Sequence, residues 1–239
     1  ETIFGGSAPA ASDKSVLISD ATNANYKYLG TYNAQGVPNY LEEQNEEISA
    51  SFLEDINNTL PERVKLPISH PEYFKDIYDH NIRLLETCDV WVTFVAEGAD
   101  YKNVLGFYTY PTNSPPQKPE DIDSITIIFP NASLAGSGGG LKAGNKVKIG
   151  RYNANTTIAW ALIANGWNGT QVTNGKWIIY STKELNMLSN PGLNQQTVLL
   201  REPGRQRFLL RIEDIQRTSS GCDHDFNDAV FFVDRKSVV

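Results

Sequence analysis

The sequence predicts a mainly β protein, an antiparallel β-sandwich of jelly-roll-like character with a short N-terminal helical section. Two observations support this fold class. From Cys88 onward, short segments rich in Val, Ile, Thr and aromatic residues alternate with clusters of Gly, Pro, Asn and Asp, the pattern of strands joined by turns. After residue 88 no helical period separates these segments, so the crossover helices of an α/β fold are excluded.

Nine segments have the length and composition of strands, and their spacing fits a sandwich. They are Val90–Ala96, Val104–Tyr110, Ser124–Phe129, Lys146–Tyr152, Thr157–Ala164, Lys176–Ser181, Thr197–Arg201, Phe208–Glu213 and Ala229–Val233.

Residues 39–80 carry helical signals instead. Asn39 followed by Glu42 fits a capping box, and a second short helix is predicted from Ser69, with Pro71 in its first turn. Apolar residues recur at helical spacing in the first of these helices: Ile48, Phe52, Leu53, Ile56 and Leu60.

The chain divides into a lead-in of small polar residues, 1–27, and a domain covering 28–239. The lead-in contains one short apolar run, Val16–Ile18. An extended apolar run of this kind can add a strand to a neighbouring subunit and build a filament.

Charge narrows the range of partners. The net charge is −7, from 21 Lys and Arg against 28 Asp and Glu. Nucleic acid would need a basic face, so it is excluded, and cations or neutral ligands are favoured. The longest stretch without charged residues, Tyr152 to Gly175, contains many Asn, Thr and Gly residues and is not a membrane span.

The two cysteines, Cys88 and Cys222, are too few for a zinc site or a disulfide framework. Two states are open for them. They form one disulfide bond between the middle and the end of the chain, or they are free thiols.

The clearest chemical signal lies before the last strand, where five carboxylates and the amide oxygen of Asn227 lie within sixteen residues. Oxygen ligands alternate with other residues along the second half of this segment, as they must when a short loop curls around one hard cation, and Ca²⁺ takes six to eight oxygens. The glycine and the glutamate of an EF-hand loop are absent, so a different calcium geometry is implied. The candidate ligands are Glu213, Asp214, Asp223, Asp225, Asn227 and Asp228.

Two features outside this segment have open interpretations. Glu97, directly after a predicted strand, is a distant metal ligand or accepts a hydrogen bond from a turn. Trp167 lies between Asn165 and Asn168. One interpretation is that it stacks on a sugar ring, as in a calcium-dependent lectin, and the other is that it folds back to cap the sandwich.

Residues 28–234 resemble a bacterial domain family of unknown function that occurs toward the C-termini of large surface proteins and adhesins, often beside the LruC domain. The resemblance is carried by Tyr28–Asn33, Gly36–Leu41, Leu60–Glu62, Asp89–Phe94, Glu97–Ala99, Leu105–Tyr108, Ile127–Asn131, Gly138–Leu141, Asn165–Trp167, Tyr180–Ser181, Glu213–Asp214 and, most specifically, Asp223–Phe231.

The resemblance implies a secreted or surface-displayed protein, similar to those of the Bacteroidetes. It also implies an acidic site for calcium formed by Glu213, Asp214, Asp223, Asp225 and Asp228. We therefore expect an extracellular module with a structural Ca²⁺ that acts in adhesion or surface assembly, with a glycan or cell-surface ligand as its partner. A lectin, a filament subunit and a hydrolase using the acidic cluster are the alternatives.

Overall fold

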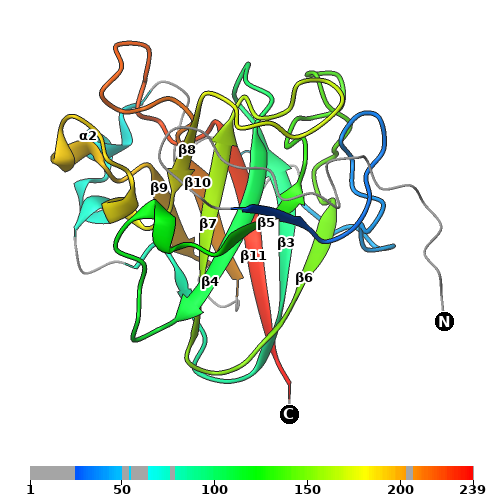
Figure 1. Cartoon of the computed structure of the whole chain (residues 1–239). Coiled ribbons are helices and arrows are strands. Elements are labelled where there is room, and N and C mark those ends of the chain that lie inside the picture. Colours follow the sequence, from blue (N-terminus) through cyan, green and yellow to red (C-terminus); the bar gives the residue numbers. More distant parts are fainter. Residues whose placement is uncertain (1–24, 50–53, 55–63, 76–78, 203–206, 239) are drawn as a thin grey trace.

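Two β-sheets stack face to face, as Figure 1 shows. The structure is a computed structural model that describes residues 25–49, 54, 64–75, 79–202 and 207–238. The predicted antiparallel β-sandwich is confirmed. The predicted run Val16–Ile18 and the second half of the first predicted helix, apart from residue 54, lie outside the described residues.

The first sheet has six strands in the order β1-β5-β4-β7-β2, with β8 also paired to β7. All its pairings are antiparallel except that of β1 with β5, which is parallel. Its strands are β1 (Asn25–Tyr28), β2 (Ile82–Arg83), β4 (Val104–Pro111), β5 (Ser124–Phe129), β7 (Thr156–Ala164) and β8 (Trp177–Tyr180).

The second sheet has five antiparallel strands in the order β6-β3-β11-β10-β9. They are β3 (Cys88–Ala96), β6 (Lys146–Tyr152), β9 (Thr197–Arg201), β10 (Arg207–Ile212) and β11 (Ala229–Ser237). All nine predicted strands are therefore present. The last of them runs four residues beyond its predicted end, while β1 and β2 were not predicted.

The helical section is shorter than predicted. A single-turn helix α2 (Leu66–Ser69) is followed by the 3₁₀ turn η1 (Pro71–Phe74). Residues 39–49 contain no helix, so the predicted helix start at Asn39 is wrong. The Asn39 backbone N–H and side-chain amide donate to the Thr31 carbonyl and hydroxyl, and the Glu42 backbone N–H donates to Lys146. The contact with Lys146 holds the segment against β6.

Three further 3₁₀ turns lie in connections between strands: η2 (Pro119–Asp121), η3 (Lys183–Leu185) and η4 (Pro191–Leu193). None of the helices in the described part of the chain combines the length and the apolar composition that a membrane span requires.

Strand β7 shows how the core is built. Its side chains alternate between the two faces of the sheet, and Ile158, Trp160 and Leu162 join the core between the sheets. The intervening Ala159 and Ala161 join a second apolar cluster on the outer face of the first sheet. This strand is therefore buried on both sides and reads as a continuous apolar run.

Candidate metal centre

The acidic segment connects two neighbouring strands of the second sheet. Ile212, the last residue of β10, pairs with Ala229, the first residue of β11. Glu213 and Asp228 therefore lie next to each other although fifteen positions separate them in the sequence. The connecting loop (orange in Figure 1) extends beyond the end of the sheet.

Backbone conformation brings the acidic side chains together. His224 and Phe226 have φ angles of 64° and 59°, a left-handed conformation that residues other than glycine seldom adopt. Because these two residues alternate with Asp223 and Asp225, the loop curls tightly. Such conformations persist where the surrounding structure enforces them, and they cluster at functional sites.

Three carboxylates converge in this curl. Glu213, Asp223 and Asp225 each offer an oxygen, and the three oxygens all lie within 4.8 Å of one another. The side chains of Glu213 and Asp225 are almost fully buried, with exposed fractions of 1% and 2%. An arrangement of this kind can hold a hard metal ion, because carboxylate oxygens are the ligands that such ions prefer.

A second pair of carboxylates adjoins these three. Asp228 accepts a hydrogen bond from the Asp214 backbone N–H at 2.7 Å. The carboxylate of Asp214 accepts one from the side-chain amide of Asn103, also at 2.7 Å. Asn103 is buried and was not predicted as a site residue. Its position directly before β4 was the only signal in the sequence.

Burial makes this cluster costly to ionise. It raises the pKa of Glu213 to about 7 and that of Asp214 to about 6. Burial, together with the charges of Asp214 and Glu213, raises the pKa of Asp228 to about 10. Removing carboxylates from water disfavours their charged forms, and a nearby metal ion reverses this effect.

Arg211 holds the loop in place through hydrogen bonds to its backbone carbonyls. Its side chain is fully buried, and its Nε donates to the Phe226 carbonyl at 2.8 Å, while Nη2 lies 3.5 Å from the Asp225 carbonyl. Burial lowers the pKa of this guanidinium to about 10, so it is charged at neutral pH. An arginine inside the apolar run of β10 is the signal that could have identified it.

Three further contacts hold the loop in place. The Leu66 backbone N–H in α2 donates to the His224 carbonyl at 2.9 Å. The His224 ring accepts a hydrogen bond from Arg217 Nε at 3.2 Å, and Arg217 Nη1 donates to the Gln195 carbonyl at 2.8 Å.

Of the two states open for the cysteines, the disulfide bond is ruled out, because both cysteines are free and buried. Cys88 begins β3, opposite Ser237, and the eight residue steps to Ala96, at the end of the strand nearest the acidic loop, span about 26 Å. The Cys222 thiol contacts Glu213 and lies 3.4 Å from His224 Nδ1. A disulfide needs Cα atoms within about 7 Å of each other.

Two predicted ligands have other roles. Asn227 donates both its backbone N–H and its side-chain amide to the carboxylate of Asp225, at 3.1 and 2.9 Å, and so orients a member of the cluster. Glu97 accepts a hydrogen bond from the Leu134 backbone N–H at 3.2 Å and also bonds the hydroxyl of Ser137. Glu97 therefore secures a neighbouring loop, as one of its two interpretations predicted, and it is not among the three carboxylates that converge.

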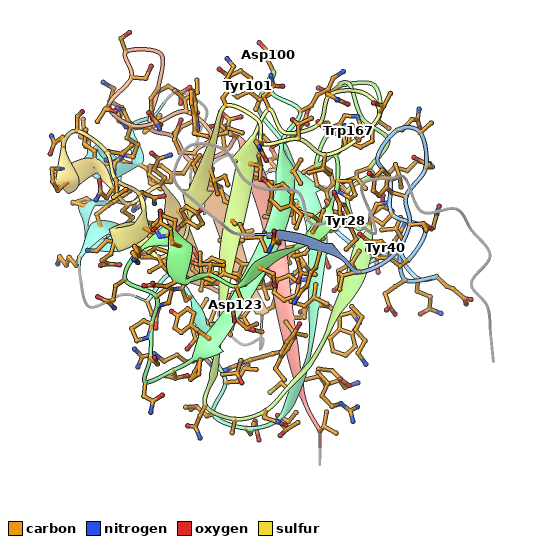
Figure 2. All side chains as sticks on the ribbon, viewed as in Figure 1. Tyr28, Tyr40, Asp100, Tyr101, Asp123 and Trp167 are labelled. Atoms are coloured by element: carbon orange, nitrogen blue, oxygen red, sulfur yellow. The ribbon has the colours of Figure 1, made fainter. Side chains whose placement is uncertain are left out.

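Of the two interpretations of Trp167, the sugar platform is ruled out, because the ring is folded back into the protein. Trp167 has an exposed fraction of 3% and packs edge-on against Tyr32 at 5.6 Å. Figure 2 shows it on the side of the molecule where Tyr28 and Tyr40 lie, away from the acidic loop. A buried ring has no face free for stacking.

The polar residues beside Trp167 are occupied within their own loop. The Asn165 backbone N–H donates to the Asn103 side chain at 3.0 Å. The Asn168 side-chain oxygen accepts from the backbone N–H groups of Thr170 and Gln171. The fold and the site together define a β-sandwich with a buried carboxylate cluster able to bind a metal ion.

Residues 152–236 match the sequence model of a family described as a domain of unknown function, DUF4114. The match runs from the end of β6 to β11 and includes the whole acidic loop. It supports the resemblance to a domain family of unknown function. Comparisons with curated proteins and with solved structures gave no significant match.

The raised pKa values predict how the metal-free protein responds to pH. Glu213, Asp214 and Asp228 hold protons more tightly in the folded than in the unfolded chain, so the folded state binds more protons above pH about 4. In chelator, their contribution is fully present below that pH and is lost as the pH rises through their folded pKa values. Urea unfolding across this range measures it.

Asp228→Asn is the control, because an amide mimics the protonated carboxyl. This variant should lose less stability between acidic and neutral pH than wild type does. An unchanged pH profile in the variant would mean that Asp228 is already ionised in the folded, metal-free protein.

Proposed function

We propose that this chain is an extracellular calcium-binding β-sandwich module of a secreted or cell-surface bacterial protein, acting in adhesion or surface assembly. The observation that carries the proposal is the convergence of Glu213, Asp223 and Asp225 within 4.8 Å. Three carboxylates at this separation repel one another unless a cation lies between them.

Calcium fits this site better than the other common divalent ions. Each carboxylate can give Ca²⁺ one or two oxygens, and backbone carbonyls and water complete an irregular shell of six to eight. Mg²⁺ needs near-octahedral geometry and keeps most of its water. A cluster of several convergent protein oxygens therefore favours the larger ion.

The ion would be structural. Its ligands come from the end of β10 and from the loop before β11, so binding joins the two strands where their pairing ends. The site is not preformed in an unfolded chain, so the free energy of binding adds to the free energy of folding. The resemblance to domains of surface proteins supports the extracellular setting, where calcium modules need a Kd of only about 0.1–1 mM.

Calorimetric titration of the full chain tests this proposal. We expect Ca²⁺ to bind with a Kd of about 0.1–1 mM, Mg²⁺ to bind much more weakly, and Asp223→Asn to remove Ca²⁺ binding. Asp123→Asn is the matched control, since Asp123 is an exposed acid beside β5 and far from the loop. Equal binding by wild type and Asp223→Asn would refute the site.

A further inference from the structure

A groove opens between the free edges of the two sheets. Strand β2 ends the first sheet and β9 ends the second, and each pairs on one side only among the described residues. The groove between them has a volume of about 840 Å³. Ile82, Leu199 and Phe208, which belong to or pack against the core between the sheets, form its apolar lining. A strand edge beside an apolar trough is a site where an extended peptide can add a strand.

The groove is positively charged on a protein with a net charge of −7. Three arginines line it, Arg83, Arg201 and Arg235, against one acid, Asp79. The acid is paired with Arg83 at 3.1 Å. Arg235 spans the opening: its Nη1 donates to the Arg83 carbonyl at 3.2 Å, and its guanidinium lies 5.5 Å from the Phe208 ring. The occupant should therefore carry acidic groups beside apolar ones.

A buried histidine in the groove wall has one ring nitrogen without a hydrogen-bond partner among the described residues. His80 has an exposed fraction of 8%, and its Nδ1 bonds nothing. Its ring also bonds the Gln195 side chain, whose amide nitrogen already donates to Tyr73 and Thr197, so the ring donates to the Gln195 oxygen. Burial lowers the pKa of His80, so the ring is neutral at pH 7 and Nδ1 accepts. A backbone N–H entering the groove would supply the missing donor.

We propose that this edge groove binds residues 13–20 of a second copy of the chain as an added strand. This segment reads Asp-Lys-Ser-Val-Leu-Ile-Ser-Asp. Its apolar centre, Val16–Ile18, matches the apolar lining, and Asp13 and Asp20 at its two ends match the arginines.

The segment must come from another copy because its own tether is too short. β1 begins at Asn25 and lies at the opposite edge of the first sheet from β2, four strand positions away. A strand added at the free edge of β2 lies five strand spacings from β1, which amount to about 24 Å. The five residue steps from Asp20 to Asn25 reach at most about 18 Å.

Donation from one copy to the next makes a head-to-tail contact. The donor segment and the groove are different surfaces, so the contact is heterologous and can continue into a chain of subunits. This assembly goes beyond calcium binding, since the groove and the acidic loop share no residues.

Sedimentation velocity over a concentration series tests the proposal with three full-length proteins. Wild type should self-associate. Leu17→Asp, which disables the donor, and Arg201→Glu, which disables the groove, should each weaken association at least about tenfold. Lys142→Glu makes the same charge change on an exposed residue away from the groove and should associate like wild type.

Mixing the two disabled variants gives the decisive result. The intact segment of Arg201→Glu should enter the intact groove of Leu17→Asp, so the mixture should form dimers and nothing larger. A monomeric wild type, variants that associate like wild type, or a mixture that stays monomeric would each overturn the proposal. Thermal unfolding of each variant checks that it is folded.

Discussion

Replacing Arg211 with alanine is expected to destabilise the protein by about 3–5 kcal/mol and to abolish metal binding. The guanidinium is fully buried and holds the carbonyls of Phe226 and Asp225. Its charge also offsets that of Asp225. Removing one partner of a buried charged network leaves the others without compensation, which costs far more than losing a surface ion pair.

Urea unfolding of Arg211→Ala and wild type in calcium measures this effect. Arg151→Ala is the control, because Arg151 forms an exposed ion pair with Asp89 on the same sheet, and its loss should change little. If both variants lose equally little free energy of unfolding, the loop does not depend on Arg211 for its conformation.

Phe226→Ala should have a comparable effect, a loss of about 3–5 kcal/mol. The ring is fully buried. It packs with Leu66 and Val198, and edge-on against Phe74 at 5.3 Å. This packing holds Phe226 in its left-handed conformation and so keeps Asp225 turned toward the other carboxylates.

Denaturant unfolding and calcium titration should both be measured for this variant. Phe226→Leu retains most of the apolar volume and should keep calcium binding with a smaller loss of stability. Full calcium affinity in Phe226→Ala would show that the loop curls without its apolar anchor, contrary to the structure.

The strands could be predicted because each carries its own signal. Nearly every strand from β3 onward has an apolar or β-branched core bounded by turn residues, and the core of β7 is apolar on both faces. β1 and β2 lack this signal. β1 is four residues, Asn-Tyr-Lys-Tyr, whose partner β5 is about one hundred positions away, and β2 has only two residues. Both strands form because they pair with strands that are distant in the sequence.

At Asn39 the reverse happened: the local sequence signal predicts a helix start that the structure does not contain. The capping residues are present, but the backbone N–H groups of Asn39 and Glu42 donate to Thr31 and to Lys146 of β6 instead of to a helix. Local propensity is a weak prior that tertiary contacts override. The same holds for Trp167, whose burial depends on Tyr32, a residue 135 positions earlier in the chain.

Within the acidic site, the alternation of Asp223 and Asp225 predicted their convergence correctly, and Glu213 joins them because β10 and β11 are neighbours. The partners of Asn103 and Arg211, which are Asp214 and Phe226, could not be predicted, since each contact joins residues far apart in the chain. Glu97 follows a strand at the same end of the sheet, but its carboxylate bonds Leu134 instead.

Thermal unfolding of wild type and Asp225→Ala, each with calcium and with chelator, tests the calcium site most directly. We expect calcium to raise the melting temperature of wild type by several degrees, because a ligand that binds only the folded state stabilises it. Asp225→Ala should melt at the same temperature in both conditions. No shift in wild type, or an equal shift in both proteins, would contradict a calcium ion held by Glu213, Asp223 and Asp225.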